Sequence, residues 1–185
     1  YVFFFFFYQN EYRRLARMRP DGTEIQYLTT EIPWDVNGLT IEETGNRALF
    51  SVNESGITKV YLLNTETLSY QPINALPVGL LGSFSWRDNS DEFFFSFSSA
   101  KNNSDVYSHN LKTAKTERWT ESELGGIVEE KLSDAKLIKW KSFDGLEISG
   151  FYFPPSKKFT GKRPVIINIH GGPEGQSLPV FQGRS

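Results

Sequence analysis

The sequence Ala48-Leu49-Phe50-Ser51-Val52 has a close counterpart in Phe93-Phe94-Phe95-Ser96-Phe97. Polar residues typical of turns precede both stretches, at positions 44–47 and 87–90. Short apolar and aromatic runs that are bounded by turn residues are the pattern of β-strands. The chain therefore contains at least two similar strand units.

The similarity continues beyond these strands. Val60-Tyr61-Leu62 matches Val106-Tyr107-Ser108, and each stretch precedes a turn, Asn64-Thr65-Glu66-Thr67 or Asn110-Leu111-Lys112-Thr113. Tyr61 and Tyr107 are 46 residues apart, and Tyr12, with the turn Pro20-Asp21-Gly22-Thr23 after it, fits the end of an earlier unit. A period of about 40 to 50 residues is typical of four-stranded propeller blades.

Residues 1–130 are therefore predicted to form part of a β-propeller, with roughly three of the about four to eight blades of a complete one. An antiparallel sandwich is the alternative, because other meanders of hairpins can produce a similar period. The opening run from Val2 to Tyr8 is predicted to be a buried strand, since it is too short for a membrane span and lacks the basic segment of a signal peptide.

The segment 139–153 has the pattern of a hairpin. Lys139-Trp140-Lys141-Ser142-Phe143 leads into Asp144-Gly145, and an alternating run from Leu146 to Phe153 follows. Asp-Gly between two such runs is a strong hairpin signal. Asp144 is therefore interpreted as a turn residue and not as a catalytic acid. Upstream, residues 124–136 show no alternation and are predicted to be a linker, either irregular or with a short helix.

The run Val165-Ile166-Ile167-Asn168-Ile169 ends at His170-Gly171-Gly172-Pro173. A β-branched run of this kind is typical of a strand that is buried on both faces of a parallel sheet. In α/β-hydrolases the loop after the third strand supplies a backbone N–H to the oxyanion hole, the group of donors that stabilises the negatively charged oxygen of the transition state. The His-Gly-Gly-Pro turn fits that loop.

The stretch from Lys162 to Gln176 closely resembles the prolyl oligopeptidase family of serine peptidases, and the chain is identified as a fragment of one. In that family a β-propeller precedes an α/β-hydrolase domain. The implied fold is mainly β, with the C-terminal blades of a propeller in residues 1–130 joined to the first strands of an α/β-hydrolase domain in residues 131–185. No tyrosine follows the strand, which favours the acylaminoacyl peptidase and dipeptidyl aminopeptidase-like branches.

The resemblance also implies roles for single residues. His170 braces the loop, Gly171 and Gly172 let the backbone approach the developing oxyanion, and Pro173 completes the motif. Glu174 is a candidate for contacting the free amino group of a substrate, as acidic residues do in aminopeptidase members. The alternatives for Glu174 are a solvated loop residue and a charge at a helix N-terminus.

A serine nucleophile is missing from the chain. No complete G-x-S-x-G elbow occurs, and Gly183-Arg184-Ser185 follows the loop too closely for the helix and strand that must precede an elbow. Neither His109 nor His170 has the context of a triad histidine. The catalytic Ser, Asp and His are therefore expected to lie beyond this chain, which is predicted to be inactive alone, because loss of the nucleophile costs about 10⁶ in rate.

Three functions fit these observations. The first is a fragment of a serine-type peptidase that acts on short peptides, with the propeller limiting access of folded proteins, as the resemblance implies. The second is a catalytically inactive binding protein that kept the propeller and the hydrolase shell. The third is a lipase or esterase with a similar Gly-Gly loop, which would have no strand repeats upstream.

Composition narrows the partners and cofactors. A net charge of −2 gives no attraction to nucleic acid or to an anionic membrane, and the absence of cysteine excludes disulfides and thiolate metal sites. No metal or organic cofactor is implied, and neither compartment nor oligomeric state follows from the sequence. The four tryptophans are predicted to lie in the core between blades, with a peptide-stacking surface as the alternative: Trp34, Trp86, Trp119 and Trp140.

Overall fold

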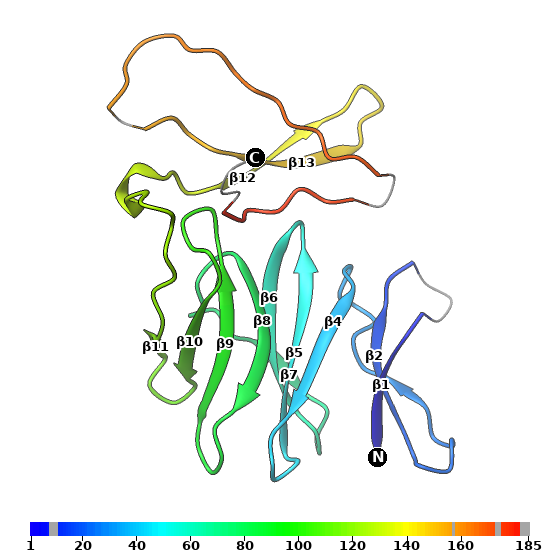
Figure 1. The fold of residues 1–185 in the computed structure, drawn as a ribbon. Coiled ribbons are helices and arrows are strands. Elements are labelled where there is room, and N and C mark those ends of the chain that lie inside the picture. The colour runs from blue at the N-terminus through cyan, green and yellow to red at the C-terminus, as the bar shows by residue number, and fades with distance from the viewer. Residues whose placement is uncertain (8–10, 157, 173–174, 182–185) are drawn as a thin grey trace.

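The computed structural model describes residues 1–7, 11–156, 158–172 and 175–181. Its strands form four separate antiparallel sheets. Three of these sheets stand side by side, and the fourth lies across one end of them (Figure 1). Four residues to which the sequence assigned a place or a role lie outside the described residues: Tyr8, Pro173, Glu174 and Ser185.

Within the three stacked sheets, the strands follow one another in chain order. The first sheet contains β1 (Val2–Phe6), β2 (Arg14–Met18) and β3 (Gln26–Tyr27). The second contains β4 (Val36–Ile41), β5 (Arg47–Glu54), β6 (Ile57–Asn64) and β7 (Tyr70–Pro72). The third contains β8 (Leu80–Trp86), β9 (Glu92–Ser98), β10 (Asp105–Asn110) and β11 (Lys115–Arg118).

The remaining elements follow the third sheet. A short 3₁₀ helix, η1 (Glu129–Lys131), interrupts the segment predicted to be a linker. It is followed by the two-stranded fourth sheet, β12 (Lys136–Lys141) and β13 (Glu147–Tyr152). Among the described residues, no helix is long and apolar enough to cross a membrane.

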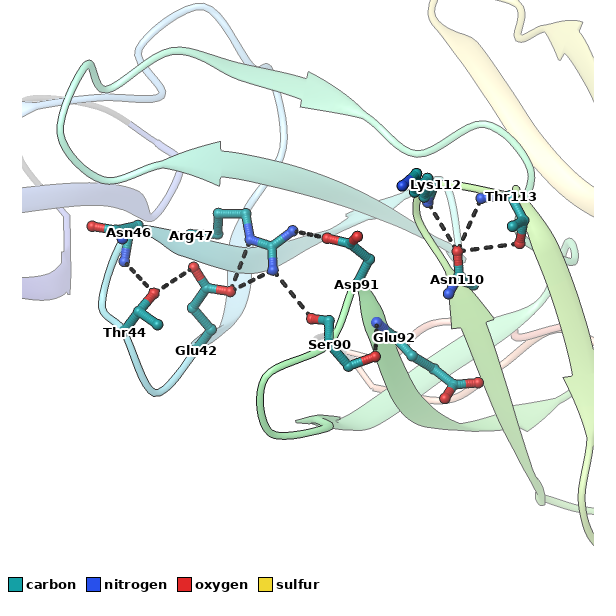
Figure 2. A network of polar contacts seen from close by, with 10 residues as sticks. All are labelled: Glu42, Thr44, Asn46, Arg47, Ser90, Asp91, Glu92, Asn110, Lys112 and Thr113. Carbon is teal, nitrogen blue, oxygen red and sulfur yellow. Dashed lines mark hydrogen bonds and ion pairs between the residues drawn. The ribbon is translucent and has the colours of Figure 1, made fainter.

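The predicted repeat is confirmed at the level of single turns. Asn64 ends β6, and its Oδ1 atom accepts hydrogen bonds from the backbone N–H groups of Glu66, at 3.0 Å, and Thr67, at 2.8 Å. Asn110 ends β10 and accepts the corresponding bonds from Lys112, at 3.0 Å, and Thr113, at 2.9 Å (Figure 2). An asparagine that caps its own turn in this way sets where the next strand begins. The second and third sheets are therefore copies of one unit.

The first sheet follows the same plan, but the predicted position of Tyr12 in it is wrong. One backbone bond recurs between the last-but-one strand of each sheet and the residue that follows its last strand: Leu28 N to Leu15 O, Ile73 N to Val60 O, and Trp119 N to Val106 O. Counted from this bond, Ala16 holds the place of Tyr61 and Tyr107. Tyr12 precedes β2 instead. The turn after β2 is capped by Asp21, whose Oδ1 atom accepts a hydrogen bond of 2.9 Å from Thr23 N, and not by an asparagine at the end of the strand.

Strand β5 is buried on both faces. Ala48, Phe50 and Val52 belong to one hydrophobic core, which the second sheet shares with Leu15 of the first. Leu49 points the other way and joins Phe93 and Phe95 of β9 in a second core between the second and third sheets. The middle sheet is therefore covered on both sides, which gives three layers. A two-sheet sandwich has only one core between its sheets.

An arginine clamp, centred on Arg47, joins the second and third sheets near the first residues of β5 and β9. Arg47 lies 2.6 Å from Asp91, donates a hydrogen bond of 2.8 Å to Glu42 and another of 3.2 Å to the carbonyl of Ser90 (Figure 2). Its guanidinium also lies 5.1 Å from the centre of the Trp86 ring. Because the clamp links the β4–β5 turn to the β8–β9 turn, it holds neighbouring layers in register.

Two of the predictions for buried aromatic residues are only partly right. The run that begins at Val2 is an edge strand, with interior phenylalanines half-buried and Phe6 47% exposed, because nothing in the described residues pairs with its outer edge. Trp34 and Trp86 pack on the cores as predicted. The other two are exposed. Trp119 follows the outermost strand β11 and is 58% exposed, and Trp140 on the two-stranded sheet is 49% exposed.

The prediction of a buried strand at residues 165–169 is not met in this chain. The segment has no strand pairing, and its four apolar side chains are 79–93% exposed. A parallel strand needs partners in its sheet and a layer on both faces. The described residues supply neither, so the run remains an extended apolar segment.

Substitution of a core phenylalanine tests this account of the layers. We expect Phe93→Ala to lower the free energy of unfolding by about 3–5 kcal/mol, because the ring is fully buried between the second and third sheets. Phe143→Ala is the matched control, since that ring is fully exposed and its loss should change stability by less than about 0.5 kcal/mol. Urea unfolding followed by fluorescence measures both. Equal effects of the two substitutions would contradict the assignment of the core.

Candidate functional site

The hairpin β12–β13 turns as the sequence predicted. Gly145 donates a backbone hydrogen bond of 3.0 Å to the carbonyl of Ser142, and Ser142 donates one of 2.8 Å to the carbonyl of Leu146. The carboxylate of Asp144 accepts a bond of 3.1 Å from the N–H of Leu146, and Gly145 has a φ of +85°. Asp144 therefore closes the turn, as interpreted from the sequence.

The His-Gly-Gly-Pro loop, residues 170–173, is called the glycine loop below. Its described part is open to solvent. His170, Gly171 and Gly172 are exposed, and the Nδ1 atom of His170 lies 2.9 Å from the carbonyl oxygen of Gly171. Gly175 returns onto these residues, because a side chain there would meet the oxygen of Gly171 and would come within 2.9 Å of His170 Nδ1. Around Gly171 itself there is room for a further group, since nothing lies within 4 Å of a Cβ built there.

The chain beyond the loop rests on the second sheet. Asn53 Nδ2 donates a hydrogen bond of 2.6 Å to Gln176 Oε1. Three residues further along the β5–β6 turn, a Cβ on Gly56 would lie 2.9 Å from the ring of Phe151 and 3.2 Å from the carbonyl oxygen of Ser177. The turn thus fits between the hairpin and the segment that follows the glycine loop. Nothing in the sequence pattern pointed to this contact.

A cavity of about 420 Å³ adjoins this contact. Its walls come from the ends of the second and third sheets, from the hairpin and from the linker, and they include Ile57, Phe97, Tyr107, Phe151 and Pro179. At its rim Lys101 and Asp134 form an ion pair of 2.9 Å between the third sheet and the linker. The lining is mixed, because polar and charged side chains such as Asn102 and Glu129 stand beside the apolar ones.

The lining of the cavity contains no histidine. His109 is buried inside the third sheet, where its Nδ1 atom lies 2.8 Å from Thr116 Oγ1 and burial lowers its pKa. Among the described residues no group of three or more His, Asp or Glu side chains could hold a metal ion.

Asp105 anchors the chain as it leaves the third sheet. Burial alone would raise the pKa of its carboxyl, but hydrogen bonds from Thr120 and Ser122 and the guanidinium of Arg118 outweigh that effect and lower the pKa to about 2. The bonds are 2.9 Å from Thr120 Oγ1, 2.7 Å from Ser122 N and 2.6 Å from Arg118 Nη2. Asn102, which lines the cavity, donates a fourth bond of 2.8 Å. The carboxylate thus ties the cavity wall to the start of the linker.

No protein-family model and no curated protein matches the chain. Among solved structures, the AtxE2 isopeptidase with astexin3-dC4 bound matches with a TM-score of 0.69 and 18% identity, over 92% of this chain and 25% of that one. Puromycin hydrolase in complex with PGG matches with a TM-score of 0.65 and 15% identity, over 92% and 27%. Dipeptidyl peptidase 4 of Porphyromonas gingivalis matches with a TM-score of 0.57 and 18% identity, over 80% of this chain and 21% of that one.

These structural neighbours are peptidases and a puromycin hydrolase, and a prolyl endopeptidase is also among them, with a TM-score of 0.57. The chain spans about a quarter or less of the length of each. At these identities the similarity shows a shared arrangement of sheets. It does not assign an activity to the chain.

The lowered pKa of Asp105 predicts a stability that depends on pH. Because the pKa is lower in the folded than in the unfolded chain, the ionised carboxylate stabilises the fold above about pH 4, by roughly 2 kcal/mol, and this contribution disappears as the pH falls from about 4 to 2. We expect Asp105→Asn to lower the free energy of unfolding at pH 7. The difference in this free energy between variant and wild type should shrink as the pH falls from about 4 to 2. Asp134→Asn, at a side chain 74% exposed, is the control. A difference that stays constant from pH 7 to 2 would refute the assignment.

The exposed run at residues 165–169 predicts self-association of the 185-residue chain. Extended apolar segments without partners pair edge to edge. Size-exclusion chromatography with light scattering should show oligomers, and Ile167→Lys should reduce them. Ile25→Lys, at another exposed isoleucine, should not. A sharp monomer peak for the unaltered chain, together with cooperative melting, would contradict this expectation.

Proposed function

We propose that this chain is part of a serine-type peptidase that hydrolyses short peptides, as an aminopeptidase, an acylaminoacyl peptidase or an oligopeptidase. The carrying observation is the order of the elements: stacked antiparallel sheets, an Asp-Gly hairpin, and an apolar run that ends at His170-Gly171-Gly172. The overlay of 92% of the chain on a peptidase supports the same interpretation.

In this proposal residues 1–130 are blades of a β-propeller and residues 131–185 begin an α/β-hydrolase domain. Two observations support the division. The two hydrophobic cores draw on residues up to Leu111 and on none of the hairpin. The bare apolar side chains of residues 165–169 suit a strand that is buried by other parts of a hydrolase sheet.

His170, Gly171, Gly172 and Pro173 form the oxyanion loop in this proposal. Backbone N–H groups at such a loop donate to the oxygen that becomes negatively charged during acyl transfer, and one donor is worth about 10² to 10³ in rate. The absence of a side chain and the open space at Gly171 leave the backbone there accessible to a carbonyl group. As a secondary part of the proposal, Glu174 contacts the amino group of the substrate. The triad lies outside these residues.

The test uses the longer protein that contains this chain. We expect it to hydrolyse short chromogenic peptides and to be labelled covalently by a fluorophosphonate, which reacts with activated serines. The 185-residue chain alone should do neither, because it lacks a nucleophile with its base. A longer protein that folds but neither cleaves peptides nor takes the label would favour the catalytically inactive binding protein instead.

A further inference from the structure

We infer that the end of the β5–β6 hairpin in the second sheet, residues 53–56, positions the glycine loop for catalysis through the pair Asn53–Gln176. This inference rests on the proposed function. It assigns a positioning role to two residues that lie 123 positions apart in the chain. Neither residue belongs to the loop motif.

Asn53 is oriented by its own turn. Its Oδ1 atom accepts a hydrogen bond of 2.8 Å from the backbone N–H of Gly56, so its amide nitrogen must face outward. That nitrogen donates the 2.6 Å bond to Gln176 Oε1. The bond from Gly56 thus fixes the orientation of the side-chain amide that donates to Gln176.

Gly56 brings the turn close enough for this bond. It is buried, has a φ of +84° and leaves no room for a side chain beside Phe151 and Ser177. A glycine is therefore required here for two reasons, its backbone conformation and the close approach. The turn is pressed between β13 and the segment that carries Gln176.

Gln176 transmits the contact to the loop. Its neighbour Gly175 packs against the carbonyl of Gly171 and the ring of His170, at distances that exclude a side chain. A displacement of Gln176 therefore moves the backbone that lies directly on the loop. Since loop donors act on the transition state and much less on bound substrate, such a displacement should lower kcat and leave KM unchanged.

The experiment measures peptide hydrolysis by the longer protein and its variants. Gln176→Ala removes the acceptor without disturbing the Asn53 turn, and we expect a fall in kcat of about tenfold, below the cost of about 10² or more for losing an oxyanion donor outright. Gln176→Glu keeps an acceptor for Asn53 and should restore kcat to within about twofold. Gln71→Ala, at an exposed glutamine on β7, is the matched control and should leave kcat unchanged.

A second variant tests the pair itself. Asn53→Ala should lower kcat, and Asn53→Ala combined with Gln176→Ala should lower it no further than Asn53→Ala alone, because both remove the same contact. Unchanged kcat in Gln176→Ala, or a rise in KM alone, would overturn the positioning role while leaving the peptidase assignment intact. A folded wild-type protein without any hydrolysis would overturn both.

Discussion

The burial of β5 on both faces is the constraint on which the rest of the structure depends. Phe50 on one face and Leu49 on the other are each about 1% exposed, so the strand requires a sheet on either side. Burying side chains of this size contributes about 1.5–3 kcal/mol each. The first and third sheets supply the two covering layers, and the Arg47 clamp keeps two of the layers aligned at one end.

The same strand carries the structure toward its candidate site. β5 begins at the clamp and ends at the turn that meets Gln176 and the hairpin, so a rigid, doubly buried strand presents that turn. Polar groups on a turn are placed more accurately when the strands beneath it cannot shift. Through this turn the second sheet contacts the segment that follows the glycine loop.

Local signals in the sequence predicted much of the fold. Asn64 and Asn110 predicted equivalent turns, and Asp144-Gly145 predicted the hairpin. Both predictions succeeded because capped turns depend on a few adjacent residues. The place of Tyr12 was wrong because the turn after β2 is capped by Asp21, three residues beyond the strand, and not by an asparagine at the end of the strand. The run 165–169 was expected to be buried because its composition demands burial, but composition does not show whether covering layers are present. Exposed polar pairs such as Asn53–Gln176 leave no periodic pattern at all.

A structure of the longer protein after reaction with a phosphonate tests the central claim most directly. The phosphonyl oxygen stands in for the oxyanion of acyl transfer. The account predicts that this oxygen lies about 2.7–3.1 Å from a backbone N–H of the loop that begins at His170, and that residues 165–169 pair within a sheet. A phosphonyl oxygen held elsewhere, with residues 165–169 still exposed to solvent, would contradict it.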